Sequence, residues 1–131
     1  MTDDDRERPR ATGSCLCGAV RYLVRGALRD VLICHCQFCQ RMNTHVGAYA
    51  ACAVSDLEFL SSRTLRWYRS SPKARRGFCN KCGSALFWEP MPPTHISISA
   101  GSLDRPTGLR VQEHILLAQK GDYYDVPDGR Q

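Results

Sequence analysis

The chain has 131 residues, 43% hydrophobic and 24% charged, and its 18 basic and 13 acidic residues give a formal charge of +5. This length predicts a single domain, and ordinary contents of 10 glycines and 7 prolines exclude collagen-like, low-complexity and disordered chains. Eight cysteines are the unusual feature of the composition.

The chain begins with a charged segment, MTDDDRERPRA, that has no apolar run. We expect residues 1–11 to be a disordered tail and residues 12–131 to be one folded domain. The segment does not have the pattern of a secretory signal, and uncharged runs such as 42–55 are shorter than the ~20 apolar residues of a membrane span. The sequence therefore predicts a cytoplasmic protein without a membrane partner.

Short alternating or apolar stretches, separated by turns, predict a mainly β fold. In residues 19–25, Val20, Tyr22 and Val24 alternate with other positions and indicate a strand with one buried face. Further strands are expected at 31–34, 46–54, 57–60, 65–68, 84–88, 95–99 and 111–118.

Helical character is confined to one short segment. Residues 36–43 are long enough for one or two turns of helix. The proline-containing segments 89–93 and 104–108 are typical of loops. Residues 120–131 carry two tyrosines and a proline, and we expect them to pack across the sheet without regular structure.

The cysteines are clustered in a way that favours metal binding over disulfides. Neighbours one or two residues apart form strained bridges, whereas several thiolates so placed converge easily on one ion. No signal directs the chain to an oxidising compartment. The spacings are Cys15-x-Cys17, Cys34-x-Cys36-x-x-Cys39, a lone Cys52, and Cys79-x-x-Cys82.

Two of the pairs end in the same Cys-Gly step. Cys79 and Cys82, followed by Gly83, have the spacing of a zinc knuckle, in which two thiolates on a tight turn bind one ion. Cys15 and Cys17 precede a glycine in the same way, and period-two spacing can place both thiolates on one side of a strand. The four together, the cysteine quartet, match the closed ligand set of a structural Zn²⁺.

Cys34, Cys36 and Cys39, the cysteine triplet, supply three thiolates. Three protein ligands and an open fourth position are typical of catalytic zinc, so we expect a second Zn²⁺ there, held less firmly than the first. Cys52, His35 and His45 are the alternatives for a fourth ligand. Cys52 is expected to be a buried apolar residue, and the side chain of His35 to point away from the cysteines. His45 is the nearest remaining candidate.

Other functions of the triplet region are less well supported. Cys36-x-x-Cys39 could be a dithiol redox motif, but no βαβ pattern surrounds it. No general base is assigned, although His35 and His45 could serve as one.

A basic stretch lies in the middle of the chain. It could bind nucleic acid or a carboxylate-bearing substrate, but alternation around Trp67 and Tyr68 favours solvated strand faces. Seven thiolates around two Zn²⁺ would lower the formal charge to about +2, which further disfavours a nucleic-acid partner. The stretch contains no acidic residue and consists of Arg63, Arg66, Arg69, Lys73, Arg75, Arg76 and Lys81.

The cysteine blocks also resemble a known family. Residues 13–22 (GSCLCGAVRY), 34–41 (CHCQFCQR) and 78–86 (FCNKCGSAL), with 100–104 and 114–118, are similar to the glutathione-dependent formaldehyde-activating enzyme (GFA) family, which includes the centromere protein V domain. The resemblance covers about residues 12–127. It implies a single-domain, mainly β, Mss4-like fold of small antiparallel sheets holding two zinc ions. It also implies that the quartet binds structural zinc and the triplet catalytic zinc.

The resemblance further implies a reaction type. The family's named activity joins formaldehyde to glutathione, formally a carbon–sulfur lyase reaction in reverse. We therefore expect a zinc-dependent carbon–sulfur lyase that acts on thiol–aldehyde adducts, with glutathione as one possible thiol. The alternative is a zinc-binding module without enzymatic activity that binds protein or nucleic acid, in which His45 or Cys52 closes the triplet site.

Overall fold

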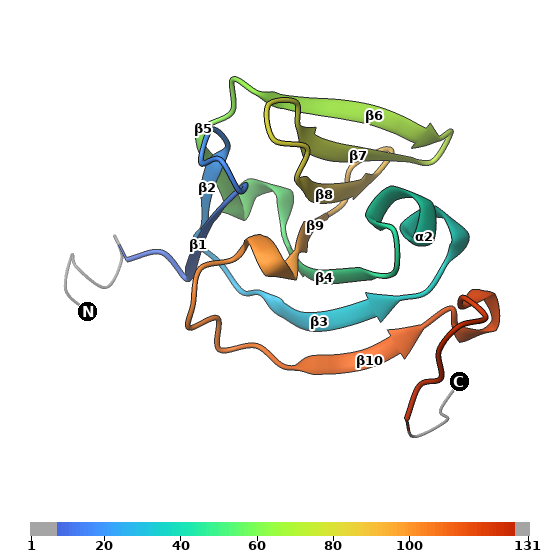
Figure 1. Cartoon of the computed structure of the whole chain (residues 1–131). Coiled ribbons are helices and arrows are strands. Elements are labelled where there is room, and N and C mark those ends of the chain that lie inside the picture. The colour runs from blue at the N-terminus through green and yellow to red at the C-terminus, as the bar shows by residue number, and fades with distance from the viewer. Residues whose placement is uncertain (1–7, 128–131) are drawn as a thin grey trace.

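Strands dominate the chain, which is described by a computed structural model over residues 8–127 (Figure 1). In chain order the elements are β1 (Ala11–Ser14), β2 (Arg21–Val24), β3 (Arg29–Cys34), α2 (Gln37–Asn43), β4 (Gly47–Cys52), η1 (Val54–Asp56), β5 (Leu57–Ser61), β6 (Leu65–Ser71), β7 (Ala74–Cys79), β8 (Ala85–Pro90), β9 (Ile96–Ser99), η2 (Ala100–Ser102), β10 (Val111–Ile115) and η3 (Leu117–Gln119).

The strands form two sheets, one with the order β1-β2-β5 and one with the order β10-β3-β4-β9-β8-β7-β6. The prediction of a mainly β, single-domain fold is confirmed. One pairing differs from the expected antiparallel sheets, because β10 lies parallel to β3 at the edge of the larger sheet. A parallel neighbour needs a long connection, and here β10 returns to β3 only after the six intervening strands.

The hydrophobic core lies between the two sheets. Val20, Tyr22 and Val24 are fully buried, which confirms the buried face expected for 19–25. The ring of Tyr22 packs edge-on against Phe87 of β8 with centroids 5.3 Å apart. Cys52 lies in the same core, 6% exposed, as expected of a small apolar residue.

Three strand predictions need correction. β1 is missing from the prediction, since its small residues have no apolar alternation. β7 is missing as well, because arginines interrupt the pattern although Arg76 is buried. β8 continues through Glu89 and Pro90, where a loop was expected, because the buried Glu89 carboxylate pairs with Arg75 of β7 at 2.7 Å.

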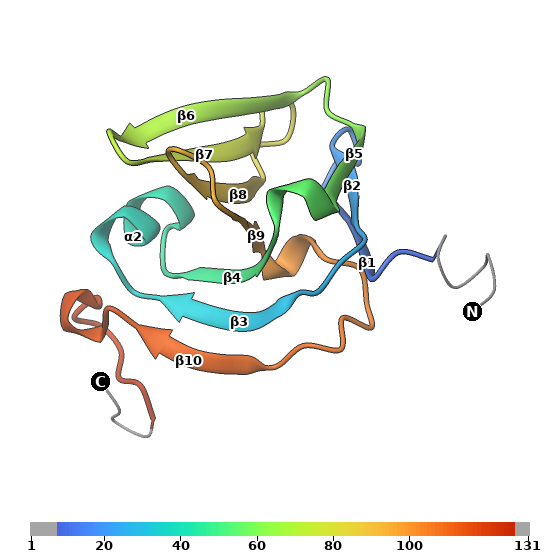
Figure 2. The same cartoon turned by 180° about the vertical axis from the view of Figure 1, so that it is seen from behind.

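The α-helix α2 lies at one end of the molecule, and the β1-β2-β5 sheet lies at the other (Figure 1, Figure 2). Cys36 caps α2, which ends at Thr44 in the left-handed region (φ 67°), close to the predicted 36–43. None of the helices within residues 8–127 has the length and apolar character of a membrane-spanning segment. The expectations for residues 1–7 and 128–131 lie outside the described residues.

Candidate functional site

The cysteine quartet joins the two sheets. The Sγ atoms of Cys15, Cys17, Cys79 and Cys82 all lie within 4.8 Å of one another. Cys15 and Cys17 lie in the turn between β1 and β2, not on a strand as expected. Cys79 is the last residue of β7, and Cys82 lies in the turn that follows it. Both turns finish in a left-handed glycine, with φ of 81° at Gly18 and 82° at Gly83, where a side chain would strain the backbone.

Hydrogen bonds to sulfur prepare the quartet for a cation. The backbone N–H groups of Lys81 and Cys82 both donate to Cys79 Sγ at 3.4 Å, and Val20 N–H donates to Cys15 Sγ at 3.3 Å. The hydroxyl of Ser84 lies 3.1 Å from Cys82 Sγ. This contact, and then backbone N–H groups of Cys17 and Ser84, lower the pKa of the Cys82 thiol to about 5. Such contacts stabilise and orient thiolate ligands, so the donor set fits a four-coordinate zinc ion.

The cysteine triplet forms at the junction of β3 and α2. Cys34 ends β3, Cys36 caps the helix and Cys39 lies in its first turn, so that their Sγ atoms fall within 4.8 Å of one another. All three side chains are buried. The backbone N–H of Cys39 donates to Cys36 Sγ at 3.3 Å. The hydrogen bond from the Cys39 thiol lowers the pKa of Cys34 and raises that of Cys39.

No fourth residue joins the triplet among residues 8–127. No His, Cys, Asp or Glu there has a ligand atom within 4.8 Å of all three sulfurs. Cys52 lies in the core between the sheets. The ring of His45 is hydrogen-bonded through Nδ1 to the Tyr123 hydroxyl. Three soft thiolates would fit a zinc ion, and a fourth ligand would have to come from a group other than these side chains.

His35 belongs to a separate hydrogen-bonded cluster. Its side chain is 2% exposed, with Nδ1 bonded to the Tyr124 hydroxyl and Nε2 2.9 Å from Nδ1 of His114. Burial and then the neighbouring His114 lower the pKa of His35. Neither His35 nor His45 lines the cavity described below, so neither is placed to serve as its general base. Sequence spacing gave no signal for this cluster, since Tyr124 lies 89 positions from His35.

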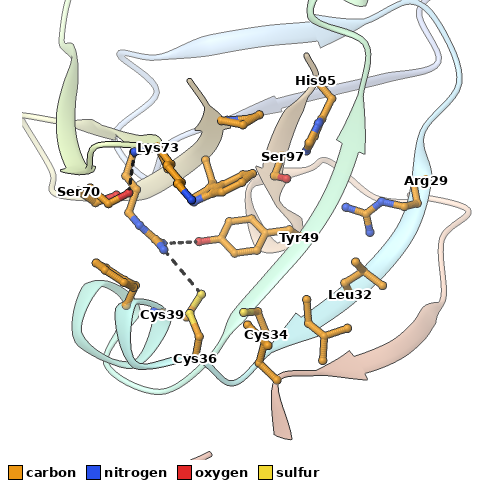
Figure 3. Close-up of a pocket in the computed structure, with 18 residues that line it drawn as sticks. Arg29, Leu32, Cys34, Cys36, Cys39, Tyr49, Ser70, Lys73, His95 and Ser97 are labelled. Carbon is orange, nitrogen blue, oxygen red and sulfur yellow. Dashed lines mark hydrogen bonds between the residues drawn. The ribbon is translucent and has the colours of Figure 1, made fainter. Parts of the chain in front are cut away.

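A cavity of about 600 Å³ opens beside the triplet. Figure 3 shows the three cysteines at one end of it, with Arg29, Lys73 and His95 around its other sides. Much of the wall is apolar, and none of the lining residues is Asp or Glu. The apolar wall includes Leu32, Phe38, Trp88 and Ile115.

Arg76 of β7 is the buried cation of this cavity. It donates from Nη1 to the Tyr49 hydroxyl at 3.2 Å and from Nη2 to Cys39 Sγ at 4.0 Å, the contacts drawn as dashed lines in Figure 3. Its side chain is 6% exposed. Among the described residues, its Nε atom has no hydrogen-bond partner. Burial raises the pKa of Tyr49, so its hydroxyl stays protonated.

The basic stretch is therefore divided between the surface and the interior. Arg66 and Arg69 are exposed and donate to nearby backbone carbonyls, in agreement with the predicted solvated strand faces. Arg75 is instead paired with Glu89 and lies 3.9 Å over the Trp67 ring, and Arg76 lines the cavity. The prediction of solvated faces was wrong for Arg76, because sequence alternation cannot distinguish an arginine that faces a cavity from one that faces solvent.

One residue of the cavity lining has an unusual backbone conformation. Leu116 lines the cavity and adopts the left-handed region with φ of 56°. A non-glycine residue there is strained by about 1 kcal/mol or more, and such strain is concentrated at functional sites. Its side chain is 51% exposed.

The fold and its two thiolate clusters define a small β protein with two candidate metal centres. The chain belongs to the glutathione-dependent formaldehyde-activating enzyme (GFA) family, whose sequence profile matches residues 10–119. It is similar in structure to a Rhodobacter sphaeroides protein, a structural genomics target, with 26% sequence identity and a TM-score of 0.64. That similarity covers 79% of this chain and 98% of the other. A comparison with curated proteins gave no match.

Proposed function

We propose that the protein is a zinc-dependent carbon–sulfur lyase that forms or cleaves adducts between a thiol and an aldehyde. The observation that carries the proposal is the triplet, which places three buried sulfurs at one end of a cavity without a fourth protein ligand among the described residues. Membership of the GFA family supports the reaction type. A cytoplasmic location, where thiols stay reduced, is part of the proposal.

The residues divide between two roles in this proposal. Cys15, Cys17, Cys79 and Cys82 would hold a structural zinc ion, and Cys34, Cys36 and Cys39 a catalytic one. When bound by the triplet, zinc would act as a Lewis acid that favours the thiolate form of a substrate thiol or polarises an aldehyde oxygen. Residues 12–131 would form the functional domain.

The reaction itself is chemically simple. The thiol sulfur attacks the aldehyde carbon, a carbon–sulfur bond forms, and the carbonyl oxygen takes up the thiol proton to give a hemithioacetal. The Tyr49 hydroxyl, which accepts a hydrogen bond from Arg76, lines the same cavity as the triplet and can donate its own O–H to the oxygen as charge develops on it. A substrate that covers the apolar part of the wall would displace water from the cavity and strengthen this contact.

The alternative of a zinc module without enzymatic activity has less support. It requires a side chain that closes the triplet and a continuous exposed basic patch, whereas Cys52 and His45 are engaged elsewhere and Arg76 is buried.

The proposal is tested by adding thiols and aldehydes to the zinc-loaded protein and following adduct formation by exchange NMR. We expect acceleration over buffer that disappears in Cys36→Ser, with Cys52→Ala as the cysteine control that retains it. Absence of acceleration across a panel of thiols and aldehydes would overturn the proposed activity.

A further inference from the structure

The side chains that line the cavity beside the triplet indicate which class of ligand it accepts. We infer that Arg76 binds a carboxylate of the substrate, and that the substrate is an apolar organic acid without an ammonium group. This inference rests on the proposed function, because it identifies the class of thiol or aldehyde that reaches the triplet.

The first argument is the state of Arg76. A guanidinium has five N–H donors, and a buried donor without a partner destabilises a protein by about 1–3 kcal/mol. Arg76 is 6% exposed, and therefore more than nine-tenths buried. Its Nε has no hydrogen-bond partner among the described residues. Tyr49 and Cys39 take one donor each from the two Nη atoms. Because Nε itself is covered, a carboxylate on the cavity side would accept the N–H groups of Nη1 and Nη2 that these partners leave free, in the planar geometry that arginine favours.

The second argument is the charge of the cavity wall. Arg29, Lys73 and His95 line the cavity together with Arg76, and the lining residues include no Asp or Glu. A bound carboxylate therefore shares the cavity with the cations of Arg29, Lys73 and Arg76 and with no lining carboxylate. An ammonium group would lose its hydration without gaining an acidic partner from the wall, which is unfavourable. A zwitterionic amino acid or peptide fits this wall less well than a simple carboxylate.

The third argument is the apolar part of the wall. Leu32, Trp88 and Ile115 reach the cavity from β3, β8 and β10, and Phe38 belongs to α2. A ligand body that covers them gains about 25 cal/mol per Å² of apolar surface removed from water. A cavity of about 600 Å³ accommodates a carboxylic acid with an aromatic ring or an aliphatic chain of similar size.

Three probes that share one skeleton separate these contributions. Titration calorimetry on the zinc-loaded protein compares 3-phenylpropanoate, which has the carboxylate, with 3-phenylpropanamide, which lacks the charge, and phenylalanine, which adds an ammonium group. We expect 3-phenylpropanoate to bind at least about tenfold more tightly than either of the others, as a charge-assisted hydrogen bond implies. None of the probes has a thiol or an aldehyde, so binding is measured without turnover.

Variants assign the effect to Arg76. Arg76→Gln is expected to remove the preference for the carboxylate, while Arg66→Gln, an exposed arginine on β6, is expected to keep it. Zinc content and far-UV circular dichroism show whether Arg76→Gln is folded. If Arg76→Gln does not fold, two other measurements test the same charge requirement. They are the binding of 3-phenylpropanoate by Arg29→Gln and the salt dependence of its binding by the unmodified protein. We expect weaker binding in Arg29→Gln and at higher salt. Equal affinity for acid and amide, equal affinity for phenylalanine, or no binding at all would overturn the inference.

Failure of this inference can be distinguished from failure of the proposed function. If thiol–aldehyde adduct formation is accelerated but glutathione is a better thiol than 3-mercaptopropanoate, the activity stands and the ligand class is wrong. If 3-phenylpropanoate binds through Arg76 but no adduct formation is accelerated, the anion site stands and the activity is wrong.

Discussion

Nε2 of His35 lies 2.9 Å from Nδ1 of His114, so that one imidazole donates a hydrogen bond to the other across the parallel β3–β10 pair. The Tyr124 hydroxyl bonds to the opposite nitrogen of His35. His35, which lies between Cys34 and Cys36, is thus held in place by β10 and by the segment that follows β10.

Replacement of His114 tests this arrangement. His114→Ala leaves Nε2 of the buried His35 without its partner, and we expect the free energy of unfolding to fall by about 1–3 kcal/mol. Urea denaturation of the zinc-loaded protein measures the change. His95→Ala is the control. The His95 ring packs against Trp88, and its hydrogen bond within residues 8–127 is the exposed contact with its neighbour Thr94, so we expect a smaller loss of stability from this variant. Equal losses for the two variants would contradict the structural role of the His35–His114 contact.

The two cysteine clusters are expected to differ in their importance for folding. The quartet connects the β1–β2 turn of one sheet with the β7–β8 turn of the other, whereas the triplet spans the adjoining elements β3 and α2. Cys79→Ser should therefore abolish the cooperatively folded state, because metal binding that closes a long loop contributes directly to folding. Cys36→Ser should keep the far-UV circular dichroism spectrum and lose about one equivalent of zinc. A folded Cys79→Ser protein with normal zinc content would rule out the structural role of the quartet.

The ion pair between Arg75 and Glu89 offers a double-mutant cycle. The Glu89 side chain is 4% exposed, so Arg75→Met leaves a buried carboxylate uncompensated and should destabilise the protein by about 3 kcal/mol. Glu89→Gln added to Arg75→Met removes that charge and should recover at least about 1 kcal/mol. Thermal unfolding of the unmodified protein, the two single variants and the double variant gives the coupling free energy between the two side chains. Arg66→Met is the control for an exposed arginine. Strictly additive losses would show that the pair contributes nothing specific.

Alkaline stability should depend on Cys52. Burial, and then the Asp56 carboxylate, raise the pKa of Cys52 from 9.0 to about 11. The unfolded thiol loses its proton above pH 9 while the folded thiol keeps it, so the folded state binds more protons and stability falls as pH rises from 9 to 11. The contribution of this one group is about 2 kcal/mol over that range. Urea denaturation at pH 8 and pH 11 should show a smaller alkaline loss in Cys52→Ala than in the unmodified protein. The same loss in both would assign the effect to other groups.

The clusters and most strands could be predicted from sequence because their determinants are local. Cys-x-x-Cys followed by glycine specifies a turn that directs two sulfurs to one point, and alternation around Tyr22 specifies which face is buried. Cys15 and Cys17 were misplaced on a strand because period-two spacing fits a strand and a turn equally well.

The cavity could not be predicted because its determinants are tertiary. Arg76 resembles its exposed neighbours in sequence, and only the pairing of β7 with β8 and the position of α2 bring it to Cys39. The contact of His35 with Tyr124 likewise depends on the path of the chain after β10. Local patterns carry no information on either.

Leu116 combines a left-handed backbone with an apolar side chain in the cavity lining. Glycine at this position would adopt the left-handed conformation without strain, but it would remove that side chain from the lining. The exchange would therefore relax the backbone and at the same time take away a surface against which the apolar body of a ligand can pack. One leucine thus links the conformational strain of the chain to the shape of the cavity.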